Sequence, residues 1–192
     1  MIVVAFYTPE YAGEIDNLRK SCEKFNIPLK TTAYPSRNSW EENCSMKSEF
    51  LMEMLNNYRD NLFYVDADGE FRRPPNWQEL ESNHLMGVVY HQWFYGTKLV
   101  NELLSGSIYL PNNDLTKETV QLWIDEQKKD RSIWDQKTLQ KVVENSIENR
   151  AFVMSKKWCY VEDYMKVSDP IIQHWQASRR LKQPINESNI KS

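Results

Sequence analysis

The sequence is poor in cysteine. Its 192 residues include only three, Cys22, Cys44 and Cys159, which are widely spaced and form no Cys-x-x-Cys pair. An odd and scattered set of this kind argues against a disulfide framework and against a zinc site. Because unpaired thiols suit a reducing compartment, we expect a cytoplasmic location.

The sequence also lacks an excess of basic charge and a long apolar run. The formal net charge is -3 at pH 7, which argues against sequence-independent binding to nucleic acid. The apolar run from Met1 to Tyr7 has no basic flank and is too short for a signal peptide or a membrane span. Internal repeats and low-complexity segments are absent from the sequence as well. We therefore expect neither a generic nucleic-acid binder nor an integral membrane protein.

The composition that remains is typical of a globular domain. Hydrophobic residues make up 41% of the chain and charged residues 27%, and 192 residues suffice to bury a hydrophobic core. We expect one domain over residues 1–182 and a polar tail over residues 183–192. Seven tryptophans favour a site with flat surfaces for rings or sugars, although most of them are expected to fill the core.

Apolar runs alternate with helical stripes along the chain. Runs rich in β-branched and aromatic residues predict strands at 2–7, 29–34, 62–65, 86–91 and 107–110. Apolar residues that recur every three or four positions predict helices at 11–26 and 46–58, and around 120–124 and 139–147. The first run is continuous and stops at Thr8-Pro9, which predicts a strand covered on both faces, as in a parallel sheet. The alternation predicts an α/β fold.

The most informative segment runs from Leu62 to Glu70. Four apolar residues, Leu-Phe-Tyr-Val, are followed directly by Asp66-Ala67-Asp68-Gly69-Glu70. Open α/β sheets bind ligands at the carboxyl ends of their strands, and two carboxylates this close repel each other unless a cation joins them. A hard divalent ion such as Mn²⁺ or Mg²⁺ prefers oxygen ligands and would bridge a diphosphate. A solvated acidic turn is the competing interpretation.

A second candidate segment lies near the end of the sequence. A short apolar run, Pro170 to Ile172, precedes His174 and would deliver it to a sheet edge. Imidazole is an acceptable ligand for Mn²⁺. Arg179 and Arg180 follow, and the guanidinium fork fits phosphate oxygens. Considered alone, a structural histidine and a solvated basic face would explain the same residues.

Two shorter motifs lie between these segments. Trp134-Asp135-Gln136 begins a predicted helix, where a carboxylate in the first turn also interacts favourably with the helix dipole. Ser105-Gly106 precedes the predicted strand at 107–110 and is compatible with a simple turn. Neither motif is specific by itself.

The order of these motifs resembles that of a known family. It is similar to the nucleotide-diphospho-sugar glycosyltransferases of A-type fold, and most similar to the glycogenin-like and related retaining enzymes, over about residues 2–182. The motifs that support the resemblance are the segment from Trp40 through Asn43 and Lys47, then Asp66-Ala67-Asp68, Ser105-Gly106, Trp134-Asp135-Gln136 and the segment from His174 to Lys182. The resemblance implies a single-domain, Rossmann-like mixed sheet flanked by helices.

The resemblance also implies a role for matching residues. A divalent metal, Mn²⁺ or Mg²⁺, would be bound by Asp66, Asp68 and His174 and would hold the diphosphate of the donor. Asp135 and Gln136 would lie beside the donor sugar as the catalytic pair. The further donor-binding candidates, some from the resemblance and some from their place after a strand or their charge, are Thr8, Tyr11, Lys47, Ser105, Gly106, Arg179 and Arg180.

Two positions depart from the family's pattern. Arg180 lies six positions after His174, where the family more often has lysine in contact with phosphate. Leu104 stands before Ser105-Gly106, where asparagine is often found. The departure at Leu104 leaves the sugar contacts of this segment open.

Elementary chemistry agrees with the function that the resemblance implies. Breaking a sugar–phosphate bond builds negative charge on the departing nucleoside diphosphate, which a metal and nearby cations would stabilise. The sugar becomes oxocarbenium-like, so a carboxylate or amide oxygen at its face helps the reaction. We expect a metal-dependent, retaining glycosyltransferase that uses a nucleotide sugar, with uridine diphosphate as the family's usual nucleotide. The acceptor, whether glycan, lipid, protein or modified nucleic-acid base, is open.

Three other functions are alternatives to the one that the resemblance implies. A strand followed by Asp-x-Asp-Gly also resembles the nucleophile motif of haloacid-dehalogenase-type phosphohydrolases, with Glu162-Asp163 as a later acidic pair. Against that alternative, Glu70 stands where the motif has threonine or valine, and two predicted strands precede it. Thr8-Pro9-Glu10-Tyr11 differs from the glycine-rich loop of sugar nucleotidyltransferases. A catalytically inactive module that binds nucleotide sugars would keep the same site residues.

Overall fold

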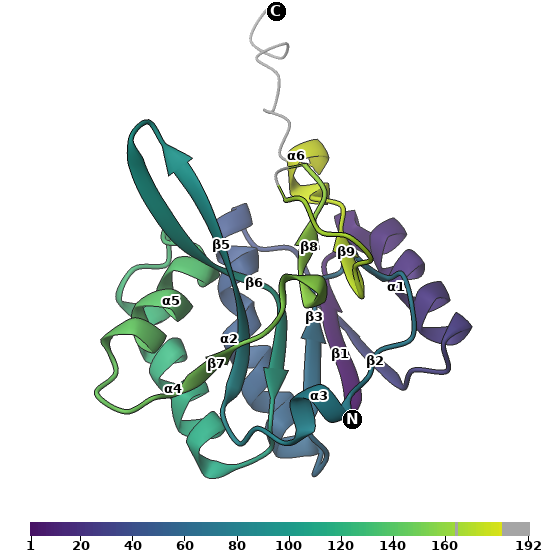
Figure 1. Cartoon of the computed structure of the whole chain (residues 1–192), viewed down its shortest axis with the longest axis horizontal. Helices are drawn as coiled ribbons and strands as arrows, with labels where there is room; N and C mark the ends of the chain where they lie inside the picture. Colours follow the sequence, from purple (N-terminus) through teal and green to yellow (C-terminus); the bar gives the residue numbers. More distant parts are fainter. Residues whose placement is uncertain (164, 182–192) are drawn as a thin grey trace, which may run out of the picture.

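The protein has a mixed α/β fold built on two sheets (Figure 1). The computed structural model describes residues 1–163 and 165–181, so the tail expected at 183–192 lies outside the described residues. The larger sheet has six strands in the order β2-β1-β3-β6-β5-β7, and the smaller sheet has three in the order β4-β9-β8. The expected fold class, a Rossmann-like mixed sheet flanked by helices, is confirmed.

The larger sheet begins with parallel strands and continues with antiparallel ones. β1 pairs in parallel with both β2 and β3, β6 pairs antiparallel with β3 and β5, and β7 joins β5 in parallel. Its strands are β1 (Ile2–Tyr7), β2 (Leu29–Ala33), β3 (Leu62–Val65), β5 (Met86–Tyr95), β6 (Lys98–Leu110) and β7 (Ala151–Val153). The parallel environment expected for the first strand is therefore confirmed.

Alternating side chains of the central strands form two separate cores. In β1, Val3 packs in the core that contains residues of α1, whereas Val4 packs in the core of the opposite face. In β3, Phe63 and Tyr64 divide in the same way, because successive side chains of a strand point to opposite faces. This double coverage explains why both strands are continuous apolar runs.

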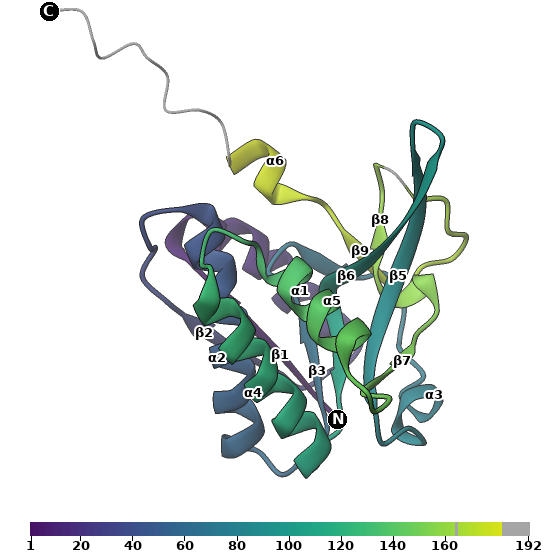
Figure 2. The ribbon, with the colours of Figure 1, turned by 90° about the vertical axis from the view of Figure 1, so that its left-hand side faces the viewer.

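Helices cover the sheet, and α2, α4 and α5 lie side by side (Figure 2). The α-helices are α1 (Ala12–Lys24), α2 (Trp40–Asn57), α3 (Gln78–Glu81), α4 (Asp114–Lys129), α5 (Asp135–Asn145) and α6 (Ala177–Leu181), and the 3-10 turns are η1 (Pro9–Tyr11) and η2 (Lys156–Trp158). Within the described part of the chain, no helix is both long and apolar enough to cross a membrane.

Two expected helix boundaries need correction. α2 begins at Trp40 and not at residue 46 as expected, because Ser39 caps it by accepting a hydrogen bond from the backbone N–H of Glu42 at 3.1 Å. α5 ends at Asn145, so Ile147 does not continue its apolar stripe and is fully exposed instead.

His174 lies in a second sheet that the sequence did not predict. The strands β4 (Gly69–Phe71), β8 (Tyr160–Val161) and β9 (Ile172–His174) form it, and His174 is the last residue of its central strand, β9. Gly69 pairs directly with His174, so the chain enters β4 right after Asp68 and aligns the histidine with the aspartates. Strands of two or three residues are too short to leave a period in the sequence, which is why this sheet was not expected.

The strands β5 and β6 form a hairpin that is longer than the sequence predicts. β6 pairs with β3 only from Ser107 to Leu110, and its earlier residues continue past the end of β3 beside β5. The expected order of Ser105-Gly106 followed by a strand is therefore wrong, since both residues lie inside β6. The hairpin projects from the end of the sheet where β3 stops (Figure 1).

Candidate functional site

A pocket of about 640 Å³ lies at the carboxyl ends of β1 and β3. Thr8 follows β1 and Asp66 follows β3, and both residues line it, as expected for a ligand site in an α/β sheet. The predicted site residues that line the pocket are Thr8, Tyr11, Lys47, Asp66, Asp68, Ser105, Gly106, Asp135, Gln136, His174 and Arg179. The structure thus brings together side chains from segments that are distant in the sequence.

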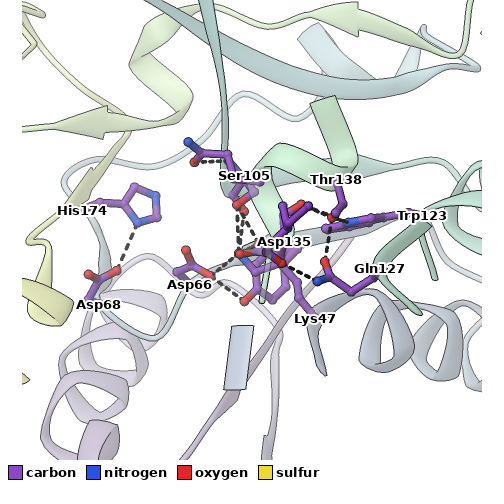
Figure 3. Close-up of polar contacts among 12 residues, drawn as sticks. Lys47, Asp66, Asp68, Ser105, Trp123, Gln127, Asp135, Thr138 and His174 are labelled. Atoms are coloured by element: carbon purple, nitrogen blue, oxygen red, sulfur yellow. Dashed lines mark hydrogen bonds and ion pairs between the residues drawn. The ribbon is translucent and has the colours of Figure 1, made fainter. Parts of the chain in front are cut away.

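Asp66, Asp68 and His174 meet at one point in this pocket (Figure 3). Each offers a ligand atom, and these atoms all lie within 4.8 Å of one another. Nδ1 of His174 lies 3.4 Å from Oδ1 of Asp68. Two carboxylates and one imidazole are a suitable donor set for Mn²⁺, and for Mg²⁺ with less preference for the nitrogen. The residues present therefore fit the metal that the resemblance implies.

Neighbouring groups orient these ligands. The backbone N–H of Ala177 donates to Oδ2 of Asp68 at 2.9 Å, and the Ser107 hydroxyl lies 2.9 Å from Nε2 of His174. The imidazole packs closely over Gly106, where an added Cβ would lie 3.1 Å from Cε1 of His174. A contact to the second ring nitrogen and a close backbone surface fix the direction of a ligating histidine.

Lys47 lies on the other side of Asp66 (Figure 3). Its side chain is 4% exposed, and Nζ lies 2.9 Å from Oδ1 of Asp66 and 2.8 Å from Oδ2 of Asp135. The same nitrogen donates to the carbonyl oxygen and to the hydroxyl of Ser105, both at 3.1 Å. One buried ammonium thus joins α2, the end of β3, β6 and α5 at the pocket.

Burial and charge shift the pKa values in this cluster. Burial lowers the pKa of Lys47, but the carboxylates of Asp135 and Asp66 outweigh it and hold that pKa above its ordinary value. Burial and the charge of Asp66 raise the pKa of the Tyr64 phenol well above its ordinary value. The phenol of Tyr64 therefore stays protonated, and its O–H donates a hydrogen bond to Oδ1 of Asp66 at 2.6 Å. Lys47 and Tyr64 both contact Oδ1 of Asp66 and so orient its side chain.

The pair of Asp68 and His174 is also charged. Burial raises the pKa of Asp68, but the hydrogen bond and charge of His174 and the N–H of Ala177 outweigh it, so the pKa is lowered. Burial lowers the pKa of His174, whereas Cys159 and Asp68 raise it, to about 10. Since only the neutral imidazole binds a metal, a divalent cation would replace the imidazolium proton as the partner of Asp68.

The beginning of α5 supplies the remaining predicted catalytic pair. α5 begins at Asp135, as expected, and the Ser105 hydroxyl donates to Oδ2 of Asp135 at 2.8 Å. The backbone carbonyl of Asp135 accepts from Nε1 of Trp123 at 3.0 Å. Gln136 accepts from the backbone N–H of Ser105 at 3.3 Å and donates to Glu102 at 2.9 Å. These contacts hold both side chains against β6, at the pocket.

Arg179 and Arg180 are separated by the structure. Arg179 lines the pocket and pairs with Asp163, whereas Arg180 pairs with Glu14 at 2.6 Å and lines a different pocket. Consecutive residues of a helix point about 100° apart, so two neighbours in α6 do not face one site. The expectation that Arg180 reaches the donor site needs this correction, and Arg179 is the arginine at the pocket.

Several pocket residues were not expected from the sequence. Tyr64 contacts Asp66, and Glu102 receives hydrogen bonds from Gln136 and from Nε1 of Trp93. The signal for Trp93 was present, because three consecutive aromatic residues, Trp93-Phe94-Tyr95, closely follow the apolar run that begins at Met86. Glu102 gave no such signal, since an isolated charge is ordinary in any surface strand.

Comparison with known proteins identifies the fold. No family model and no curated protein matches the sequence. A solved structure of a glycosyltransferase involved in the glycosylation of the major capsid of PBCV-1 matches with a TM-score of 0.71 and 12% identity, over 94% of this chain and 97% of that chain. The glycosyltransferase GlyE of Streptococcus pneumoniae TIGR4 matches with a TM-score of 0.61 and 16% identity, over 97% of this chain and 57% of GlyE.

The apo form of GlyE matches equally well, with a TM-score of 0.61 and 16% identity, over 56% of its own length. The chain therefore spans little more than half of GlyE, whereas it spans nearly all of the PBCV-1 protein. At these identities the likeness is one of fold. The chain has the A-type, Rossmann-like fold of the nucleotide-sugar glycosyltransferases.

Proposed function

We propose that this protein is a metal-dependent glycosyltransferase. It would move a hexosyl or pentosyl group from a nucleoside diphosphate sugar, with uridine as the base, to an acceptor with retention of configuration. The observation that carries the proposal is the convergence of Asp66, Asp68 and His174 within 4.8 Å in a large pocket at the carboxyl ends of the sheet. The glycosyltransferase fold of the chain supports the same reaction class.

The metal site would bind the diphosphate of the donor. Asp66, Asp68 and His174 would hold Mn²⁺ or Mg²⁺, and the ion when bound supplies positive charge that stabilises the departing diphosphate. Lys47 and Tyr64 keep Asp66 oriented before the donor arrives, which lowers the cost of rearrangement during the reaction. Arg179 is the guanidinium at the pocket that would contact a phosphate oxygen.

The other proposed donor contacts come from different elements that line the pocket. Thr8 and Tyr11, just beyond β1, would contact the base and the ribose, and Ser105-Gly106 in β6 would border the donor sugar. Asp135 and Gln136 would lie beside the anomeric carbon, where a carboxylate or amide oxygen stabilises an oxocarbenium-like sugar. Because Lys47 already pairs with Asp135, it would act there by orienting the carboxylate.

The position of Asp135 suggests how the donor sugar is held. Asp135 is buried and is fixed by Lys47 and Ser105, so it presents one arrangement of its carboxylate to the pocket. A carboxylate that is already oriented stabilises positive charge without first rearranging.

We also propose a cytoplasmic location, which the three free cysteines support.

A binding experiment tests the proposal directly. Isothermal titration calorimetry of uridine diphosphate should show an affinity that Mn²⁺ raises by about 5- to 150-fold, the usual range for two coupled ligands. Asp68→Ala should abolish that increase, because it removes one of the metal ligands. Asp16→Ala is the matched control, since Asp16 is an exposed aspartate of α1 that pairs with Arg19 and lies outside the pocket.

Two results would contradict the proposal. Equal affinity for uridine diphosphate with and without Mn²⁺ in the unsubstituted protein would exclude the metal-diphosphate site. Metal-dependent hydrolysis of an aryl phosphate that disappears in Asp66→Asn would instead indicate a phosphohydrolase.

A further inference from the structure

The β5–β6 hairpin extends the wall of the pocket into solvent. Beyond the end of β3, the two strands pair from Gln92 with Asn101 to Tyr95 with Lys98. The first part of this extension already belongs to the pocket, because His91, Trp93 and Glu102 line it. Two views at right angles show the hairpin projecting from the same end of the sheet (Figures 1 and 2).

One face of the hairpin continues the pocket wall, and the other face points away from the pocket. Residues directly opposite each other in an antiparallel pair share a face, and alternate residues of a strand do so as well. Trp93 and Tyr95 therefore lie on the same face as Glu102, which is the face that continues the pocket wall. Phe94 and Leu99 lie on the opposite face.

The pocket-side face presents two aromatic rings at right angles. The rings of Trp93 and Tyr95 lie 6.1 Å apart with an interplanar angle of 87°. Trp93 is 37% exposed and Tyr95 is 73% exposed. The indole N–H of Trp93 donates to Oε2 of Glu102 at 3.0 Å, which holds the ring in position. Two ordered rings and a carboxylate thus lead from the pocket towards the hairpin tip.

We propose that this face of the hairpin, formed by Trp93, Tyr95 and Glu102, binds the acceptor, and that the acceptor is a carbohydrate. The inference rests on the proposed function, since an acceptor must reach the donor sugar in the same pocket. Sugar rings carry C–H groups that pack on aromatic faces and hydroxyl groups that donate to carboxylates. The hairpin face offers both kinds of contact side by side.

The charge of this face favours a sugar over other acceptors. The two strands give this face one cation, Lys98 opposite Tyr95, and one carboxylate, Glu102, which pairs with Lys137 at 3.3 Å, so the face presents no basic patch for the phosphates of a nucleic acid. A lipid surface would contact the apolar side chains of the opposite face, Phe94 and Leu99, at least as strongly. A neutral polyol suits the rings and the carboxylate together.

An array of immobilised oligosaccharides tests this inference. The unsubstituted protein should bind at least one glycan, and Trp93→Ala and Tyr95→Ala should each weaken that binding by at least about fivefold. Trp93→Phe should keep more binding than Trp93→Ala because it retains a ring. Phe94→Ala is the matched control: Phe94 is as exposed as Tyr95 but lies on the opposite face, so this variant should bind as the unsubstituted protein does.

Three outcomes would overturn the inference. The first is that the unsubstituted protein binds no glycan. The second is that Phe94→Ala weakens glycan binding as much as Tyr95→Ala does. The third is that the protein binds phosphatidylcholine vesicles and that Phe94→Ala abolishes this binding. Mn²⁺-dependent binding of uridine diphosphate is measured on the same samples. If that nucleotide binding is present while the array result fails, only the carbohydrate acceptor is wrong. If the unsubstituted protein does not bind the nucleotide, the proposed function fails and the acceptor role fails with it.

Discussion

At the scale of single residues, Lys47 places a buried positive charge between two carboxylates. Its ammonium is buried between the carboxylates of Asp66 and Asp135 and also bonds to Ser105. A buried charge is tolerated only when it is paired and hydrogen-bonded, and each of these partners contributes to that. Lys47 therefore acts on the site by holding two predicted site carboxylates in place.

Replacement of Lys47 by methionine is expected to destabilise the protein strongly. The substitution keeps the apolar stem but leaves the Asp135 side chain, which is 6% exposed, without its cation. Breaking a buried pair from one side costs about 3–5 kcal/mol of unfolding free energy. Urea denaturation of Lys47→Met, followed by tryptophan fluorescence, measures this loss.

An exposed lysine provides the control for Lys47→Met. Lys137 lies 3.3 Å from Glu102 but its side chain is 41% exposed. Lys137→Met should therefore change the unfolding free energy by less than about 1 kcal/mol, as for other exposed ion pairs. Equal losses in the two variants would show that burial of Lys47 does not matter.

At the scale of elements, α2 depends on its first turn. Ser39 accepts a hydrogen bond from the N–H of Glu42, and the Glu42 side chain accepts one from the N–H of Asn38 at 3.3 Å. This reciprocal arrangement resembles a capping box shifted by one residue and begins the helix that presents Lys47 to the pocket. The direction of α2 is thus set close to the site.

Loss of the Ser39 cap is expected to cost stability. Ser39→Ala leaves the N–H of Glu42 without its side-chain acceptor and should lower the unfolding free energy by about 1 kcal/mol. Thermal or urea unfolding measures the change. Ser39→Asp keeps an acceptor and adds a negative charge at the helix N-terminus, so it should retain the stability of the unsubstituted protein. A Ser39→Asp variant as unstable as Ser39→Ala would argue against the cap.

At the scale of the whole molecule, an aromatic cluster joins the two sheets. The ring of Trp158 lies 5.2 Å from that of Phe63 in β3 and 5.5 Å from that of Trp77. Phe71 of the smaller sheet completes the cluster, at 6.2 Å from Trp77. The smaller sheet supplies His174 and the larger one precedes Asp66, so this packing sets the distance between the proposed metal ligands.

Trp158→Ala is expected to loosen both the fold and the site. Removal of a fully buried tryptophan costs about 3–5 kcal/mol, because a cavity remains where the indole was. The Mn²⁺-dependent gain in affinity for uridine diphosphate should fall along with the unfolding free energy. Urea denaturation and calorimetry on the same sample measure both quantities.

Trp158→Phe separates packing from other effects of the change. The phenyl ring fills part of the space between Phe63 and Trp77, so this variant should lose less stability than Trp158→Ala. Unchanged metal dependence in a clearly destabilised Trp158→Ala would show that the cluster stabilises the fold without positioning His174.

The strength of each local signal explains which features were predictable. The strands before Thr8 and Asp66 are covered on both faces, so their apolar runs identified them, and α5 begins at Asp135, within the Trp134-Asp135-Gln136 motif that was predicted to begin a helix. The small sheet was not predictable, because its strands of two and three residues leave no period. The different directions of the Arg179 and Arg180 side chains could not be predicted either, since they depend on how the short helix α6 is rotated relative to the pocket.

The sequence by itself determined the layered α/β fold and the presence of carboxylates at the end of a central strand, because burial on both faces imposes an apolar pattern that stops where the strand meets solvent. The tertiary structure brings Asp66, Asp68 and His174 together, as the resemblance implied, and it alone decided that Lys47 joins Asp66 to Asp135 and that an aromatic hairpin continues the pocket. Contacts between distant segments depend on pairing and packing, for which no local pattern in the chain is required.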